Sequence, residues 1–195
     1  MKNLNSKLVV IMVMIYGIMT YIIPESIYYL GLSRYGIIEK KYIFQFVSYM
    51  FVHGSLMHLF SNSLALAIFG NHVERVIGSK KYLTFFLVCG VLSGLSSFLL
   101  YSALNINSLL IGASGAVYAI MLLFSVLYPS AEILVLGLIP LKSPHLILVY
   151  LILEFALQFR QDNIAHFAHL SGLVIAFVYI IVVFKINPFK QRKKS

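Results

Sequence analysis

The stretches Gly112-Ala113-Ser114-Gly115-Ala116-Val117-Tyr118-Ala119 and Ala168-His169-Leu170-Ser171-Gly172 decide how this chain folds. Each opens or occupies an apolar segment suited to a lipid bilayer, and each combines small residues with a polar side chain. From Ala168 onward, small residues recur every four positions, which gives a helix face that another backbone can approach closely. The pattern therefore predicts two membrane helices in close contact, with Ser114 near His169.

The composition is that of a polytopic membrane protein. Of the 195 residues, 61% are hydrophobic and only 11% are charged, and the mean hydropathy is +0.93. Soluble domains are about a quarter charged, and a spanning helix needs about 20 apolar residues. We therefore expect an all-α fold with a single membrane domain over residues 1–195 and a long external loop at 24–55. The six expected transmembrane helices cover roughly 6–23, 56–77, 82–103, 113–129, 144–160 and 166–185.

The basic residues predict the orientation in the membrane. Six spans put both termini on one side, and cytoplasmic termini would place eleven basic residues on that side and four on the other, as the positive-inside rule requires. The net charge of +9 then reflects topology and attraction to lipid headgroups, so no nucleic-acid partner is expected. A compact six-span form fits a bacterial plasma membrane. The inner set is Lys2, Lys7, Arg75, Lys80, Lys81, Lys142, Lys185, Lys190, Arg192, Lys193 and Lys194, and the outer set is Arg34, Lys40, Lys41 and Arg160.

Ser114 and His169 are the candidate catalytic residues. Ser114 follows a turn at Gly112, at the outer end of the fourth expected span, where the N–H groups of a helix start can stabilise an anion. His169 lies at a similar depth in the sixth span, and ionisable side chains within a membrane tend to be functional. A serine beside an imidazole is a nucleophile with its base. With no carboxylate well placed as a third member, we expect a dyad in which Tyr118 packs against the imidazole.

Further polar residues near the outer ends of the spans have supporting roles. His58 and Asn62 are four positions apart, so they share one helix face and can stabilise an oxyanion together with backbone N–H groups. His53 precedes this helix and is expected to orient the loop, and His166 is expected to be a neighbouring structural residue in the sixth span. Glu154 lies within the fifth span, where it can pair with a polar neighbour or tune the site.

The histidines could alternatively form a metal site. His53, His58, His166 and His169 could converge, and histidine is a common zinc ligand. The chain has no His-Glu-x-x-His pattern and no carboxylate at a useful spacing from the histidines. We therefore expect neither a metal nor a cofactor.

Taken together, these residues resemble the rhomboid family of intramembrane serine proteases. The resemblance rests on His53-Gly54-Ser55-Leu56-Met57-His58 followed by Asn62, on Glu74-Arg75-Val76-Ile77-Gly78-Ser79, on the long aromatic first loop and on the two stretches that hold the serine and the histidine. Phe44-Gln45 stands where the family often has Trp-Arg, and Ala176 stands where it often has glycine. These departures concern loop packing and helix contacts.

The resemblance implies a six-transmembrane-helix rhomboid-like bundle and a role for each site residue. Ser114 would be the nucleophile, His169 the general base and Tyr118 the support of the imidazole, while His58 and Asn62 would line the oxyanion hole. The implied activity is that of a serine endopeptidase that cleaves single-span transmembrane proteins near the outer face, in contact with membrane lipids.

Two other functions stay open at this point. The chain could be a catalytically inactive rhomboid-like binder of transmembrane helices. It could also be a small transporter with a polar site at the membrane midplane, which would predict inverted repeats and interrupted helices. The chain has no internal repeat, and its polar residues gather toward one face of the membrane.

Overall fold

The computed structural model describes residues 3–135, 138–157 and 164–188 and is mostly helical. The helical run over residues 56–77 is divided by a π-helical segment, η3, because the i→i+4 ladder is interrupted there. The longer helical elements are α1 (Leu4–Tyr21), α4 (Leu56–Ala65), η3 (Leu66–Gly70), α5 (Asn71–Ile77), α6 (Ser79–Ala103), α7 (Ser114–Leu127), α8 (Ser143–Leu157) and α9 (Ile164–Val182).

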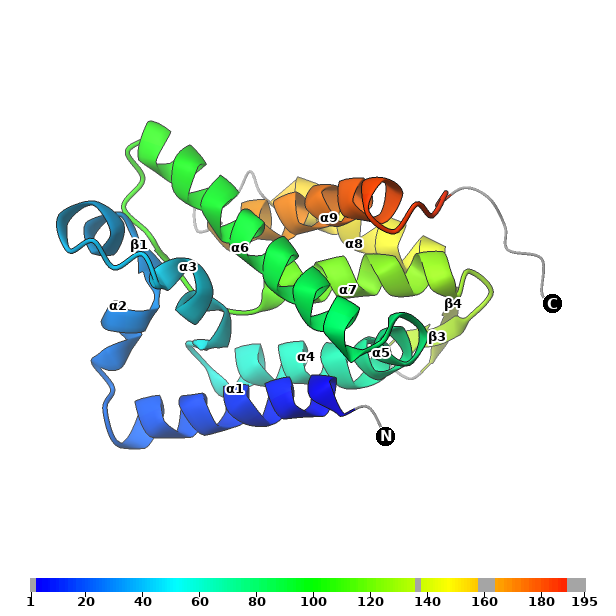
Figure 1. The fold of residues 1–195 in the computed structure, drawn as a ribbon, viewed down its shortest axis with the longest axis horizontal. Helices are drawn as coiled ribbons and strands as arrows, with labels where there is room; N and C mark the ends of the chain where they lie inside the picture. Colours follow the sequence, from blue (N-terminus) through cyan, green and yellow to red (C-terminus); the bar gives the residue numbers. More distant parts are fainter. Residues whose placement is uncertain (1–2, 136–137, 158–163, 189–195) are drawn as a thin grey trace.

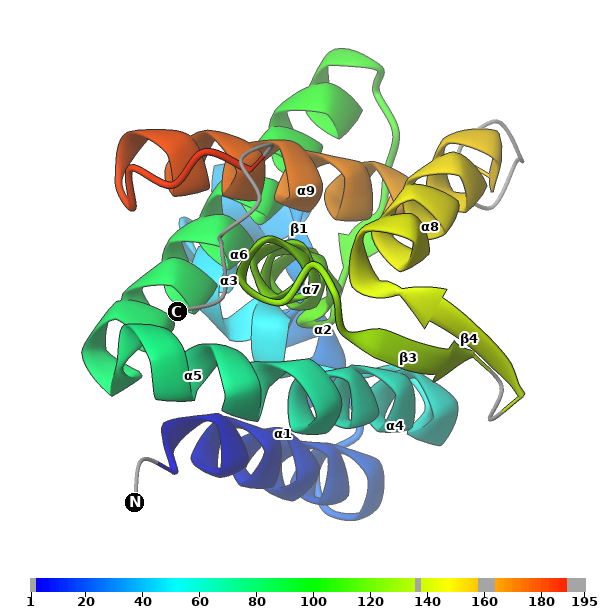
Figure 2. The ribbon, with the colours of Figure 1, turned by 90° about the vertical axis from the view of Figure 1, so that its right-hand side faces the viewer.

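Helix α7 lies at the centre of the bundle. Figure 2 shows it end-on, with α4, α6, α8 and α9 around it and α1 outside α4. Small residues allow this packing: a Cβ added to Gly172 of α9 would overlap the backbone of Gly115 in α7, so these two helices meet backbone to backbone. The start of α1 and the end of α9 lie at the same end of the bundle (Figure 1).

The lengths of the helices bear on membrane crossing. In the part of the chain that the structure describes, α1 and α6 are long and apolar enough to cross a membrane. A third span is added if Gln45–Phe51 and Leu56–Ile77, which meet at 93°, count as one broken span. Helices α7, α8 and α9 are apolar but shorter. These helices fall on the segments expected from the sequence, with their ends displaced by a few residues.

Two short antiparallel strand pairs depart from the purely helical expectation. Strand β1 (Leu32–Ser33) pairs with β2 (Leu109–Leu110), which ties the first loop to the segment before Ser114. Strands β3 (Glu132–Val135) and β4 (Ile139–Lys142) form a hairpin between α7 and α8. Strands of two to four residues are too short to leave a periodic pattern in the sequence, which therefore does not predict them.

The loop at residues 24–55 is built from short elements held by one buried glutamine. Gln45 is fully buried; its Nε2 donates to the Tyr29 carbonyl at 2.9 Å and its Oε1 accepts from the Ser33 N–H at 3.2 Å. The loop thus packs firmly around Gln45. The short elements are α2 (Ser26–Leu30), the π-helical η1 (Tyr35–Glu39), α3 (Gln45–Ser48) and the 3₁₀ turn η2 (Tyr49–Phe51).

A buried carboxylate joins the start of α1 to α5 and α6. Glu74 is 1% exposed, and its oxygens accept the N–H groups of Leu4 and Asn5 at 3.1 and 3.0 Å and the hydroxyl of Ser79. The first N–H groups of a helix have no partner within it, so Glu74 acts as a cap supplied from another helix. Tyr82 adds a 2.6 Å hydrogen bond to the Asn5 side chain.

Candidate active site

Ser114 and His169 meet in the interior of the bundle. The Nε2 atom of His169 lies 2.7 Å from the Oγ atom of Ser114, although the two residues are 55 positions apart. Ser114 is the first residue of α7, and His169 lies in the second turn of α9. The close approach of Gly115 and Gly172 allows this contact. The distance is within the hydrogen-bond reach needed between a nucleophile and its base.

The ring of Tyr118 lies flat against the imidazole of His169. Their centroids are 4.6 Å apart and the rings are inclined by only 11°. Tyr118 also meets Tyr150 of α8 edge-on at 5.8 Å. Tyr118 therefore restricts the rotation of the imidazole and links α8 to the Ser–His pair.

His58 and the start of α7 form a site suited to an oxyanion. Gly112 has φ +106°, a conformation that favours glycine, and a Cβ there would lie 2.5 Å from the His58 Nε2 atom. Within α7 the hydrogen bonds begin only with the Val117 N–H, which donates to the Ala113 carbonyl. The N–H of Ser114, at the helix start, has no acceptor within the helix. The imidazole and this N–H can both face a developing negative charge beside Ser114.

Asn62 lies in the same cleft, one turn after His58. One N–H of its carboxamide donates to the His58 carbonyl at 3.1 Å. An amide has two N–H donors, so the second can serve a ligand.

The other two histidines predicted to support the site, His53 and His166, lie beside it. His53 is 3% exposed and meets the His58 ring edge-on at 4.9 Å. Burial first, and the neighbouring His58 second, lower the pKa of His53 to about 4, so its ring is neutral at pH 7. His166 meets the His169 ring edge-on at 5.9 Å. The side chain of Glu154 lies outside the described part of the structure.

Two residues that position the site, Ser93 and Tyr49, were not foreseen from the sequence. The Ser93 hydroxyl donates to the carbonyl of Ala168, next to His169, at 2.6 Å. The Gly112 N–H donates to the backbone carbonyl of Tyr49 at 2.9 Å, and the Tyr49 hydroxyl donates to the Gly90 carbonyl at 2.6 Å. The recurrence of small residues in α6 could have pointed to Ser93. Tyr49 lies among other loop aromatics and carries no such signal.

The Ser–His pair opens into a cleft with a volume of about 590 Å³. Its walls come from α4, η3, α7 and α8, and strand β3 closes one end. Its polar groups gather around Ser114, and the rest of the lining is apolar or aromatic. A water or peptide group can therefore reach Ser114, while an apolar chain can occupy the remainder.

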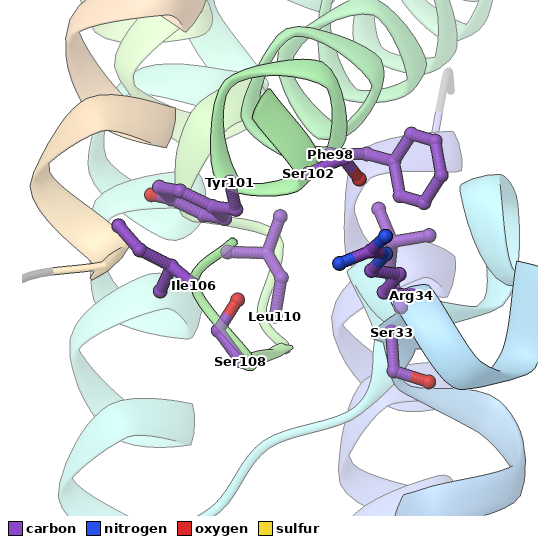
Figure 3. Close-up of a pocket in the computed structure, with 9 residues that line it drawn as sticks. Ser33, Arg34, Phe98, Tyr101, Ser102, Ile106, Ser108 and Leu110 are labelled. Carbon is purple, nitrogen blue, oxygen red and sulfur yellow. The ribbon is translucent and has the colours of Figure 1, made fainter. Parts of the chain in front are cut away.

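A second cavity lies apart from this cleft and shares no lining residue with it. Its volume is about 10 Å³, room for roughly one water molecule. Figure 3 shows it between Tyr101 and Leu110 on one side and Arg34 and Phe98 on the other. Arg34 donates to the Asn105 side chain at 3.1 Å nearby. Among the residues that the structure describes, no three histidine, cysteine, aspartate or glutamate side chains gather to hold a metal ion.

The apolar helical bundle and its hydrogen-bonded serine and histidine define a membrane-embedded protein with a polar site inside it. The family model of the rhomboid domain matches residues 40–186, and the chain belongs to the rhomboid family. It is an integral membrane protein.

The relatives include proteins of a plant, a fungus and a bacterium. The chain is 28% identical over 190 residues to Rhomboid-like protein 15 of Arabidopsis thaliana, covering 90% of this chain and 45% of the relative. It is 30% identical over 139 residues to the mitochondrial Rhomboid protein 1 of Saccharomyces cerevisiae, covering 68% of this chain and 39% of the relative. It is 26% identical over 153 residues to the rhomboid protease GluP of Bacillus subtilis, covering 78% and 28%. The chain thus spans less than half of the length of each of these three relatives.

Proposed function

We propose that this rhomboid-family chain is an intramembrane serine endopeptidase that uses a Ser114–His169 dyad. The observation that carries the proposal is the 2.7 Å separation of the His169 Nε2 and Ser114 Oγ atoms inside an apolar bundle. Similarity to proteins named as rhomboid proteases supports the same activity.

The first half-reaction acylates the serine. His169 Nε2 takes the hydroxyl proton while Ser114 Oγ bonds to the scissile carbonyl carbon, and the carbonyl oxygen becomes an oxyanion. The Ser114 N–H, His58 and Asn62 donate to this oxygen, each such donor being worth about 3 kcal/mol in the transition state. The C–N bond then breaks, and the imidazolium returns its proton to the leaving amine.

The second half-reaction needs water at the same place. His169 deprotonates a water molecule, whose oxygen bonds to the acyl carbon, and the ester bond to Ser114 breaks with return of the proton to Oγ. The Tyr118 ring is stacked on the His169 imidazole and keeps the imidazole in the same orientation for both proton transfers.

The topology proposed for this chemistry has six membrane spans and cytoplasmic termini. The shared position of the start of α1 and the end of α9 supports it (Figure 1). Helix α7 has 14 residues and rises about 21 Å, less than the roughly 30 Å of the hydrocarbon core. With its other end at the cytoplasmic interface, Ser114 lies below the outer surface of the bilayer.

Substrates suited to such a site are single-span membrane proteins. A peptide bond within a helix is shielded by its own hydrogen bonds, so the substrate must unwind near its outer end to expose the scissile carbonyl. Small or helix-breaking residues at that point favour unwinding. A plasma-membrane location for the chain stays a prediction from the sequence, and mitochondrial proteins are among its relatives.

Fluorophosphonate labelling of the full chain in detergent tests the proposal. The wild type should become covalently labelled, and Ser114→Ala and His169→Ala should not. Ser125→Ala is the matched control, because it removes a serine from the opposite end of the same helix, and it should label like the wild type. Failure of the folded wild type to label would reject the dyad and favour the non-catalytic binder of transmembrane helices.

A further inference from the structure

The cleft that holds Ser114 continues far beyond the Ser–His pair. Along α4 and η3 its lining runs from His58 to Phe69, and Ile133 and Leu134 of strand β3 form its other end. His58 and Phe69 are eleven positions apart, which corresponds to about 16 Å of helix. The cleft is therefore long enough for about eleven residues of a helix that lies alongside α4.

The polarity of the lining changes along this length. Histidine, serine and asparagine side chains surround Ser114, whereas Leu64, Ile68, Met121 and Leu146 line the part toward β3. A chain that is unwound at one end and apolar along the rest matches this distribution. The cleft is continuous with the nucleophile, so its occupant is the transmembrane segment of the substrate.

The β3–β4 hairpin closes the cleft at the end of the bundle where the chain termini lie. Figure 2 shows β3 leaving α7 toward α4 and β4 returning to α8, so the hairpin crosses between α4 and α8. Its base is firmly held: the Ser143 N–H donates to the Ala131 carbonyl at 2.9 Å, and the Ser143 hydroxyl donates to the Tyr128 carbonyl at 2.6 Å. Leu134 nevertheless leaves 61% of its surface exposed.

We propose that Ile133 and Leu134 are specificity-determining residues that contact the helical, apolar part of the substrate's transmembrane segment, at the end of the cleft away from Ser114. The inference rests on the proposed function. An aliphatic surface at this position favours apolar substrate side chains over charged ones, because a charge placed against it loses part of its hydration. The enzyme would thus recognise its substrate at two separate positions, one near the cleaved bond and one near the opposite end of the transmembrane segment.

Photo-crosslinking tests the contact directly. The full chain carrying Ser114→Ala, which leaves substrate uncleaved, receives benzoylphenylalanine at position 134 or 138. It is placed in vesicles of phosphatidylethanolamine and phosphatidylglycerol with a synthetic single-span Leu/Ala peptide whose outer end has a Gly-Ala break. Leu138 is the matched control, being 81% exposed on the same hairpin but outside the cleft lining. We expect crosslinks from position 134 only, mapping to the helical, apolar part of the peptide beyond the break. No crosslink from 134, or equal yields from both positions, would overturn the proposal.

A charge exchange tests specificity. Leu134→Asp should lower kcat/KM for the apolar peptide at least fivefold, and Leu138→Asp should not. A lysine at the contacting peptide position should restore cleavage by Leu134→Asp and impair cleavage by the wild type, a result that a misfolded variant could not give. Unaltered cleavage by Leu134→Asp rejects the hairpin contact while leaving the protease proposal intact. If the wild type takes no fluorophosphonate label, the protease proposal fails by itself, and crosslinking still decides the contact.

Discussion

The hydroxyl of Ser93 in α6 holds the carbonyl of Ala168 in α9 at 2.6 Å, one residue before His169. Ser171 donates to the same carbonyl at 3.0 Å. The backbone next to the imidazole is thereby fastened to α6 as well as to its own helix. The position of the base thus depends on a helix that contributes no residue to the proposed dyad.

Ser93→Ala should weaken this fastening. We expect a loss of about 1 kcal/mol in the free energy of unfolding, as is typical of hydrogen bonds between membrane helices, together with slower fluorophosphonate labelling. SDS-induced unfolding in mixed micelles measures the first quantity. Ser97→Ala is the control, since the Ser97 hydroxyl donates to the Ser93 carbonyl of its own helix. Equal losses in both variants would contradict a specific role for the bond to Ala168.

Gly172→Ala should separate α7 from α9. The added methyl group would overlap the Gly115 carbonyl, so the helices must move apart and carry Ser114 away from His169. A displacement of about 1 Å in a catalytic group can lower the rate about 100-fold, and we expect a loss of that order in labelling rate. Gly17→Ala serves for comparison, because a Cβ at Gly17 has no atom within 4 Å. Rapid labelling of Gly172→Ala would count against the backbone contact.

Glu74→Gln should destabilise the bundle at the start of α1. The substitution replaces a charged acceptor of the Leu4 and Asn5 N–H groups by a neutral amide. Hydrogen bonds to charged groups contribute about 2 kcal/mol, and we expect a loss of that size in the free energy of unfolding. The same measurement on Glu39→Gln, at an exposed position, should show no loss. If the two variants unfold alike, the cap contributes nothing.

His58→Ala should impair chemistry more than binding. If its imidazole stabilises the oxyanion, kcat should fall about 100- to 1,000-fold with little change in KM, since the interaction forms only in the transition state. Cleavage kinetics with a single-span peptide in vesicles provide both constants. His72→Ala, a histidine bonded to the Ile68 carbonyl on the same helical run, is the comparison. A rise in KM at constant kcat would assign His58 to substrate binding instead.

Part of the fold and of the candidate site can be predicted from the sequence, and part cannot. Apolar composition predicts a helix such as α6, and four-residue spacing of small residues predicts the close approach at Gly172. The one-turn spacing between Ser114 and Tyr118 placed the tyrosine on the face that meets the imidazole. These signals are local, because they depend on helix period alone.

The missed features are long-range. Leu32 pairs with Leu110, and Asn5 bonds to Tyr82, across 78 and 77 positions of sequence. Such contacts leave no periodic pattern in the sequence around either residue, so no local pattern predicts them. Tyr49 is 2% exposed, yet in the sequence it resembles the headgroup-facing tyrosines around it. Only the packed fold distinguishes it from them.

The separation of Ser114 and His169 by 55 positions also has a consequence during biosynthesis. Membrane proteins are made from the N-terminus onward, so Ser114 enters the bilayer while the ribosome still has α8 and α9 to deliver. Until α9 packs against α7, Ser114 lacks its proposed base. In the proposed protease, the half-made chain is therefore inactive toward its neighbours in the insertion machinery, and distance along the chain has the effect that a removable propeptide has in other proteases.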